Sequence, residues 1–155
     1  MNIEYPKAVV FKCSHCGVCC GDTDQKTRHI LLTEKDARRI SQFTRQPIRK
    51  FAYPVEGKSP YLYEMRKNAG TKKCLFHQNS QCKIYSCRPL ICRFYPFQLT
   101  EEQGKYTFKL TSECPEVHTL DALSEGEILG ERYFRQLLKV AFDELSPAGN
   151  TAASR

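Results

Sequence analysis

Nine cysteines supply most of the chemistry available to this chain of 155 residues. Four of them fall within eight positions, in the run Cys13-Ser-His-Cys16-Gly-Val-Cys19-Cys20. A C-x2-C pair lets two thiolates converge on one metal from a tight turn, and four thiolates suit zinc or an iron–sulfur cluster. Gly17 and Gly21 are expected to provide the positive φ angles that such turns often need.

A second group of cysteines lies further along the chain. C-x2-C-x2-C opens the ligand run of bacterial-type ferredoxins, and Cys-Pro closes it; Cys114-Pro115 provides that dipeptide here. Cys19 and Cys20 are adjacent, and neighbouring side chains reach two metals more easily than one. The spacing therefore predicts metal binding, with an iron–sulfur cluster (4Fe–4S type) favoured over zinc and the number of centres left open. The second group consists of Cys74, Cys82, Cys87 and Cys92.

Composition excludes two classes of protein and makes disulfides the weaker explanation of the thiols. No apolar run approaches the roughly 18 residues that span a bilayer, so no membrane contact is expected. Eight Tyr and nine Phe are too many for a disordered chain. Residues 1–7 show no cationic stretch followed by an apolar one, which predicts a cytoplasmic protein. An odd number of cysteines also argues against a closed disulfide framework.

Two helices have clear start signals. One is expected over about 34–44, because Thr33 and Asp36 form a capping pattern and Pro47 follows it. The other is expected over about 125–145, opened by a capping box at 124–127. Its apolar face is predicted to consist of Phe134, Leu138, Ala141, Phe142 and Leu145.

Strands are expected to be short. Residues 97–100 and 106–110 flank Gly104 and indicate a β-hairpin, whereas the Arg88-Pro89 step argues against regular structure in 74–92. The predicted class is a small, cysteine-rich α+β fold organised by metal, with an irregular metal-binding core, one hairpin and two helices. We expect one domain over 1–146 and a disordered tail over 147–155. Further short strands are predicted within 5–11, 28–32 and 61–65.

The ordered cysteine pattern resembles the YkgJ-type cysteine-cluster family, also called CxxCxxCC, whose domain is described as zinc- or iron-chelating. The similarity extends from about residue 11 to 116 and includes the helix start at Thr33, Asp36 and Arg39. It also covers the segment Cys82-x-Ile-Tyr-x2-Arg-Pro-x2-Cys92-Arg-x-Tyr-Pro96. The resemblance implies that Cys87 is the spare thiol, although Cys114 is the other candidate. The implied ligands are Cys13, Cys16, Cys19, Cys20, Cys74, Cys82, Cys92 and Cys114.

Other side chains near these cysteines are weaker candidates. Arg88 and Arg93 flank ligand positions and are predicted to offset thiolate charge or to donate hydrogen bonds around the centre, unless they pair with carboxylates or solvent. His15 and His77 are alternative ligands. No nucleotide-binding fingerprint, general acid or general base accompanies the cysteines, so whether the chain is an enzyme stays open.

The net charge of +7 divides into a basic body and an acidic end, since 1–112 carries +11 and 113–155 carries −4. This asymmetry supports an alternative function, a zinc-ribbon-like module that binds nucleic acid or a protein through the basic region 26–50. Eight thiolates with two divalent metals would reduce the net charge to about +3. Nucleic acid is therefore the less favoured partner, and a protein partner stays open. The favoured function is metal binding with a structural, redox or accessory role.

Overall fold

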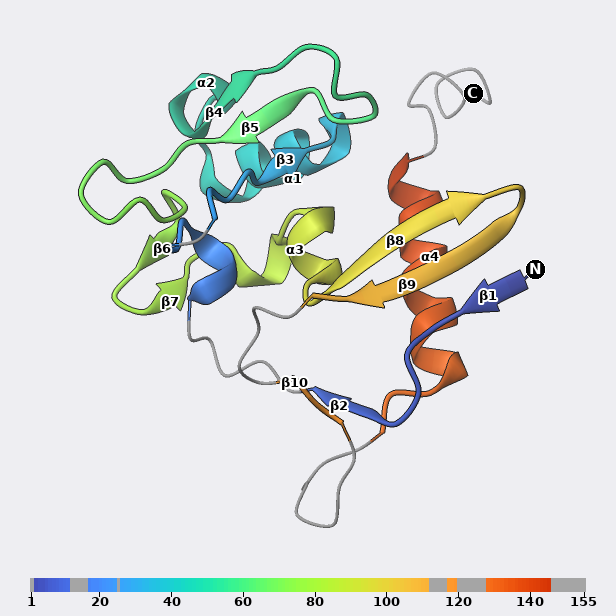
Figure 1. Ribbon diagram of the computed structural model, residues 1–155. Coiled ribbons are helices and arrows are strands. Elements are labelled where there is room, and N and C mark those ends of the chain that lie inside the picture. Colours follow the sequence, from blue (N-terminus) through green and yellow to red (C-terminus); the bar gives the residue numbers. More distant parts are fainter. Residues whose placement is uncertain (1, 12–16, 25, 112–116, 120–127, 146–155) are drawn as a thin grey trace, which may run out of the picture.

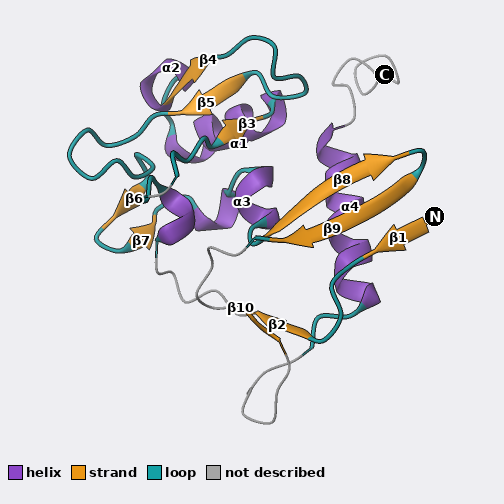
Figure 2. Ribbon diagram, viewed as in Figure 1, coloured by secondary structure: helices purple, strands orange, loops and turns teal. Residues whose placement is uncertain are grey.

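The computed structural model describes residues 2–11, 17–24, 26–111, 117–119 and 128–145, and the statements below concern these residues (Figure 1). They form a small mixed α/β fold with four α-helices and four small sheets (Figure 2). The helices are α1 (Glu34–Thr44), α2 (Ile48–Phe51), α3 (Leu90–Phe94) and α4 (Glu131–Leu145), with 3-10 turns η1 (Val18–Cys20) and η2 (Tyr85–Cys87). The strands are β1 (Asn2–Glu4), β2 (Val9–Phe11), β3 (Leu31–Leu32), β4 (Ala52–Pro54), β5 (Tyr63–Met65), β6 (His77–Gln78), β7 (Gln81–Cys82), β8 (Phe97–Glu102), β9 (Lys105–Leu110) and β10 (Val117–Thr119).

The first half of the chain packs α1 beside a three-stranded sheet of order β3-β5-β4. The predicted start of α1 is confirmed, because the Thr33 hydroxyl accepts from the Asp36 N–H over 3.0 Å and the Asp36 carboxylate accepts from the Thr33 N–H over 3.1 Å. The helix ends at Thr44, and Arg45 follows it with a φ of +57°. Leu32, Ile40 and Phe51 are fully buried between these elements and form the centre of the first core.

The second half of the chain packs α4 against the predicted hairpin, β8–β9, which β1 extends as a parallel strand. Two residues with positive φ, Gln103 (52°) and Gly104 (78°), connect β8 to β9. Two-residue hairpin turns with positive φ at both positions match the right-handed twist of the strands that they connect. Phe97, Phe108 and Phe134 form the centre of a second core between the hairpin and α4.

The predicted start of α4 is wrong. Residues 124–127 lie outside the described part, but Ile128 is extended and bridges to Val10, and the Leu129 N–H donates to the Val9 carbonyl over 2.9 Å. Strand pairing with β2 therefore delays the helix until Glu131. Of the predicted apolar face, Phe134, Leu138 and Ala141 are buried, whereas Phe142 and Leu145 are 39% and 38% exposed; Phe142 still packs edge-on against the Tyr106 ring.

Two short helices were not predicted, and both follow a proline. Pro47 precedes α2 and Pro89 precedes α3, each with a φ suited to the residue that begins a helix (−66° and −54°). The prediction that 74–92 lacks regular structure is wrong, because this stretch contains β6, β7, η2 and the start of α3. In Figure 1, α3 lies between the part of the chain with η1, β6 and β7 and the part with β8, β9 and α4.

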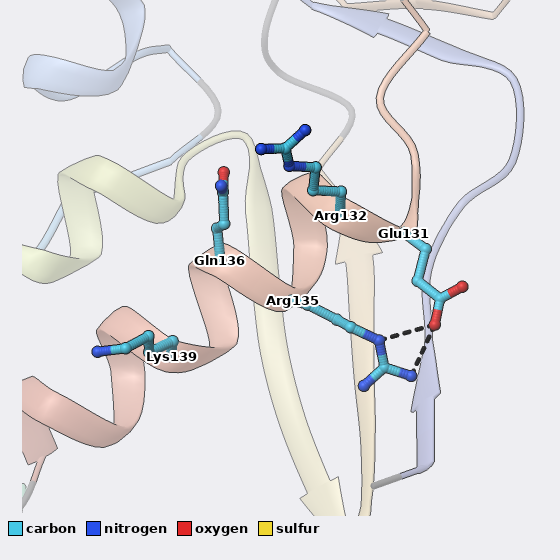
Figure 3. Close-up of a pocket in the computed structure, with 5 residues that line it drawn as sticks. All are labelled: Glu131, Arg132, Arg135, Gln136 and Lys139. Carbon is cyan, nitrogen blue, oxygen red and sulfur yellow. Dashed lines mark hydrogen bonds and ion pairs between the residues drawn. The ribbon is translucent and has the colours of Figure 1, made fainter.

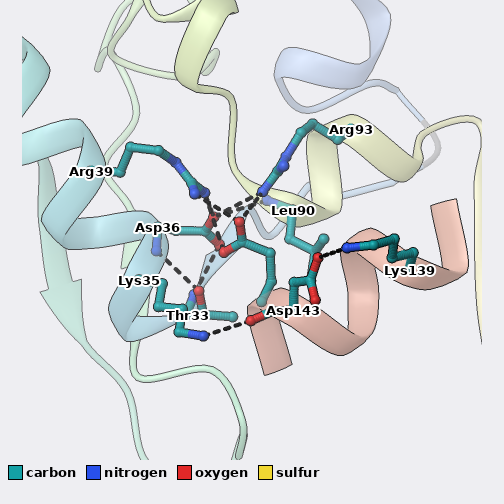
Figure 4. A network of polar contacts seen from close by, with 9 residues as sticks. Thr33, Lys35, Asp36, Arg39, Leu90, Arg93, Lys139 and Asp143 are labelled. Carbon is teal, nitrogen blue, oxygen red and sulfur yellow. Dashed lines mark hydrogen bonds and ion pairs between the residues drawn. The ribbon is translucent and has the colours of Figure 1, made fainter. Parts of the chain in front are cut away.

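A buried carboxylate joins α1 to α3. Asp36 is completely buried, and one of its oxygens accepts from the backbone N–H of Leu90 over 3.1 Å and from the Arg39 guanidinium over 2.8 Å. Arg39 and Arg93 both pair with Glu144 of α4, over 2.7 and 2.9 Å. Figure 4 shows the two guanidinium groups approaching Asp36 from opposite helices. This network fixes the place of α3, and α3 carries one of the predicted ligands.

Replacing Glu144 by Gln is expected to lower the free energy of unfolding by about 1.5–3 kcal/mol, because two arginines lose a charged acceptor. Burial acts to raise the pKa of Glu144, but hydrogen bonds from Arg39 and Arg93 outweigh burial and lower it. The contribution of Glu144 is therefore complete above its usual pKa of 4.5 and is lost as the pH falls below that value. Urea unfolding of E144Q at pH 7 and pH 4 measures both effects.

Asp143→Asn is the matched control for Glu144→Gln. Asp143 is the adjacent residue of α4, and its carboxylate pairs with Lys139 while both side chains are more than 60% exposed. A change within about 0.5 kcal/mol is expected for this variant. Equal losses in the two variants would contradict the role of the buried network.

No helix in the described part of the chain combines the length and the apolar character that crossing a membrane requires.

Candidate metal centre

The described part of the first cysteine group is joined by backbone hydrogen bonds to the start of the second. Cys19 and Cys20 lie in η1, and the Cys20 carbonyl accepts from the Cys74 N–H over 2.6 Å. The neighbouring residues Gly21 and Lys73 form an antiparallel β-bridge. Two segments more than 50 positions apart in the sequence therefore lie side by side at the cysteines.

Two further cysteines approach from β7 and α3. Cys82 lies opposite His77 in the β6–β7 pair, and the His77 N–H donates to the Cys74 carbonyl over 2.9 Å. This short hairpin brings Cys82 back toward Cys74. Cys92 lies in α3, where the Cys92 N–H donates to the Pro89 carbonyl over 3.0 Å.

Five of the predicted ligands lie close enough for their charges to act on one another; we call Cys19, Cys20, Cys74, Cys82 and Cys92 the thiol set. Burial, together with the charges of Cys82 and Cys19, raises the pKa of Cys74 to about 11, although backbone hydrogen bonds act in the other direction. Burial also raises the pKa of Cys92, with Cys74, Cys19 and Cys82 adding to the effect. The charges of these cysteines therefore act on one another across three segments of the chain; Cys74 is buried, and the other four side chains are partly exposed.

The adjacent thiols of Cys19 and Cys20 act on each other. The Cys20 thiol, with help from Arg28, lowers the pKa of Cys19 to about 6, and the Cys19 thiol raises the pKa of Cys20. Cys20 is also affected by the charges of Cys92 and Cys74. Both side chains therefore lie near the rest of the thiol set, as a centre that uses both of them requires.

The chemistry of the thiol set fits zinc or an iron–sulfur centre. Thiolates are the soft ligands that both prefer, and most of these thiols hold their protons strongly because their negative charges would be buried together. A bound cation replaces those protons and removes the repulsion. Among the described residues no three metal-binding side chains stand in a metal-binding arrangement. Three predicted ligands, Cys13, Cys16 and Cys114, lie outside the described residues.

Cys87 has different surroundings. It is buried in the first core, and the charge that affects its thiol most is that of Arg39, followed by that of Cys82. None of the other four members of the thiol set is among the causes of its raised pKa, which burial dominates. That Cys87 is the spare cysteine stays a prediction, and a discriminating test is given below.

The two arginines predicted near the centre have other contacts. Arg93 pairs with Glu144 in the buried network. Arg88 donates from Nε to the Tyr85 carbonyl over 3.1 Å and stacks on the Tyr85 ring, although its charge still reaches Cys19. The sequence reasoning missed Arg28, whose charge lowers the pKa of both Cys19 and Cys92. No spacing rule relates Arg28 to the cysteines.

His77 remains a candidate ligand, whereas His15 lies outside the described residues. The Nε2 atom of His77 is buried without a hydrogen-bond partner in the described part of the chain. It faces Gly17, where an added Cβ atom would come within 2.8 Å of it. Burial and the charge of Lys73 lower the pKa of His77, so its ring is neutral at pH 7.

The two glycines of the first cysteine group are required for different reasons. Gly17 has a φ of +81°, as predicted, and its carbonyl accepts from the Cys20 N–H over 3.1 Å. Gly21 has an extended φ of −165°, so the prediction of positive φ there is wrong. It is required instead because a Cβ atom at this position would lie 2.7 Å from the backbone of Lys72 and Lys73.

Gly21→Ala is therefore expected to separate η1 from the segment before Cys74 and to reduce the amount of metal bound after purification. Gly130→Ala is the matched control, because a Cβ atom at Gly130 meets nothing within 4 Å. Elemental analysis of both variants measures the effect. Full metal content in Gly21→Ala would show that the close approach is dispensable.

A surface hollow on α4 lies apart from the thiol set, lined by Glu131, Arg132, Arg135, Gln136 and Lys139 (Figure 3). Its positive charge is largely compensated, since Arg135 pairs with Glu131 over 2.6 Å and Lys139 with Asp143 over 2.7 Å. In the region 26–50, Arg38 pairs with Glu34, and Arg39 pairs with Asp36 and Glu144.

Comparison with known proteins agrees with the cysteine pattern. The profile of the CxxCxxCC family, described as "Putative zinc- or iron-chelating domain", matches residues 12–115. An uncharacterized protein of Methanocaldococcus jannaschii is 31% identical over 109 residues, which are 66% of this chain and 53% of that protein. The chain thus spans about half the length of this relative. No solved structure matches the chain. The matched segment includes every member of the thiol set, and the chain belongs to the CxxCxxCC family of metal-chelating domains.

Proposed function

We propose that the protein binds an iron–sulfur cluster through its cysteine thiolates and that this centre has a structural role together with a redox or accessory one. The observation that carries the proposal is the backbone hydrogen bond that joins Cys20 to Cys74, together with the mutual electrostatic effect of five thiols from η1, the segment 74–82 and α3. Membership of a zinc- or iron-chelating family supports metal binding in general.

A centre with more than one metal atom is favoured by the number and placement of the thiols. A single tetrahedral zinc ion takes four ligands, whereas five described thiols lie within reach of one another's charge and three more predicted ligands lie outside the described residues. Cys19 and Cys20 are adjacent in η1, and each thiol shifts the pKa of the other. Iron–sulfur clusters bind thiolates on several metal atoms, which suits this arrangement.

A structural role follows from where the thiols lie. Cys74 belongs to the first core, and Cys20, Cys82 and Cys92 pack against it. A centre bound to these residues would join η1, β7 and α3, three elements that share few apolar contacts. Electron transfer is the additional role that an iron–sulfur centre would make available.

The test is purification without oxygen, followed by visible absorption spectroscopy and measurement of iron, acid-labile sulfide and zinc. A brown sample with broad visible absorption, containing iron and sulfide in similar amounts, is the expected result. A colourless sample with about two zinc ions per chain would replace the iron–sulfur proposal by a zinc centre. A sample without metal, even after reconstitution with iron and sulfide or with zinc, would overturn metal binding.

A further inference from the structure

Arg28 follows the first cysteine group, and a hydrogen bond from its backbone N–H holds it in place. The Arg28 N–H donates to Asp22 Oδ1 over 2.8 Å, and the same oxygen pairs with Lys67 over 2.6 Å. The Asp22 N–H also donates to the Lys72 carbonyl over 3.2 Å. These contacts close the loop from 22 to 28 against the segment that leads to Cys74.

The guanidinium of Arg28 is turned into the protein. Its central carbon lies 5.1 Å from the centre of the Tyr95 ring, a distance at which the ring attracts a cation. Its Nε and Nη2 atoms are buried and have no acceptor among the described residues. Leaving a buried charged donor without an acceptor costs about 1–3 kcal/mol or more. We therefore expect these two donors to have an anionic acceptor.

The contacts of Arg28 place its guanidinium beside two cysteine segments. Asp22, which accepts from the Arg28 N–H, lies two residues after Cys20, and Tyr95, whose ring faces the guanidinium, lies three residues after Cys92. The charge of Arg28 also lowers the pKa of Cys19 and of Cys92. Thiolates of these two segments are therefore anionic acceptors close to the free donors of Arg28.

We propose that Arg28 donates hydrogen bonds from Nε and Nη2 to sulfur atoms of the bound centre and thereby stabilises its more negative state. This inference rests on the proposed function, because it requires a centre held by the thiol set. Hydrogen bonds to the sulfurs and nearby positive charge are recognised determinants of cluster potential. Arg28 thus acts as a positioning residue that raises the reduction potential and slows the loss of metal.

The test compares Arg28→Gln, Arg28→Lys and Arg38→Gln in the full chain after reconstitution with iron and sulfide. Arg28→Lys keeps the positive charge but loses the planar donor geometry. Arg38→Gln removes the same charge from an exposed pair, since Arg38 is 63% exposed. Metal content, thermal midpoint and reduction potential are measured for each variant. In the redox titration the reductant gives one electron to the bound centre, and no bond is broken.

For Arg28→Gln we expect unchanged metal content and at least a tenfold shift toward the oxidised state at a fixed potential, about 59 mV for one electron. Arg28→Lys should lie between this variant and the wild type, and Arg38→Gln should match the wild type. A potential unchanged in both Arg28 variants would overturn the proposal, even if the thermal midpoint falls. If Arg28→Gln does not fold, the comparison of Arg28→Lys with Arg38→Gln decides in the same way.

The failure of the iron–sulfur proposal would be seen separately, as zinc without iron in the wild type. The role of Arg28 is then tested by the rate at which zinc passes to a coloured chelator. About tenfold faster transfer from Arg28→Gln than from Arg38→Gln would support the hydrogen bonds to sulfur. Equal rates would overturn them.

Discussion

Removal of the metal is expected to abolish cooperative thermal unfolding. Cys74 belongs to the first core, and Cys20, Cys82 and Cys92 pack against it, so loss of the cation removes the bonds that would join η1, β7 and α3 at this core. Structural zinc contributes roughly 10–16 kcal/mol of apparent binding free energy, as much as the entire stability of a typical domain, about 5–15 kcal/mol. Circular dichroism during heating, with and without chelator and reductant, measures the change.

Readdition of metal is the control for this experiment. The reductant prevents new disulfides, so restored cooperativity after adding metal attributes the loss to the metal alone. Cys16→Ser is expected to act in the same direction, because Cys16 is a predicted ligand. A thermal midpoint that stays the same after complete removal of metal would contradict the structural role of the centre.

The second large effect is a contrast between two cysteines that lie five positions apart. Cys92→Ala is expected to lose most of the bound metal, since its thiol lies among Cys74, Cys19 and Cys82. Cys87→Ala is expected to keep its metal, because Cys87 packs in the first core beside Arg39. Residues that only support a ligand change metal affinity by about 10–100-fold, so the loss of a ligand should exceed that range.

Metal titration of the apo proteins measures this contrast, and elemental analysis after purification supplements it. Cys87→Ala should cost about 1 kcal/mol of stability, because it removes one buried sulfur atom from the core. Equal metal loss in both variants would make Cys87 a ligand. Loss in Cys87→Ala alone would reverse the assignment of the spare thiol.

Local signals predicted the elements that depend on near neighbours in the sequence. Thr33 and Asp36 are three positions apart, and their reciprocal hydrogen bonds start α1 where expected. Gly104 and the alternating segments beside it likewise predicted the β8–β9 hairpin. Both features are decided within a few residues.

Features that depend on distant segments were missed. The start of α4 is displaced because Ile128 and Leu129 pair with β2, almost 120 positions away. Gly21 is required by the approach of Lys72 and Lys73 rather than by its own backbone angles. Arg28 lies near the thiols only because the loop from 22 to 28 closes against the segment before Cys74. The residues adjacent to these positions in the sequence do not indicate such contacts.

The candidate site shows the same division. Cysteine spacing and family resemblance identified the members of the thiol set, whose proximity depends on the pairing of η1 with the Cys74 segment. For Arg93 the sequence left two roles open, and the structure shows the carboxylate pairing, which joins α3 to α4 through Glu144. Its position beside Cys92 did not reveal which way its side chain points.

X-ray absorption spectroscopy at the edge of the bound metal, on protein purified without oxygen, tests the central claim most directly. We predict a first shell made of sulfur only, together with a second shell of metal–metal scattering from a centre with several metal atoms. A first shell of nitrogen and oxygen would contradict binding by the thiol set. A sulfur shell without metal–metal scattering would contradict the iron–sulfur cluster and leave a single metal ion in its place.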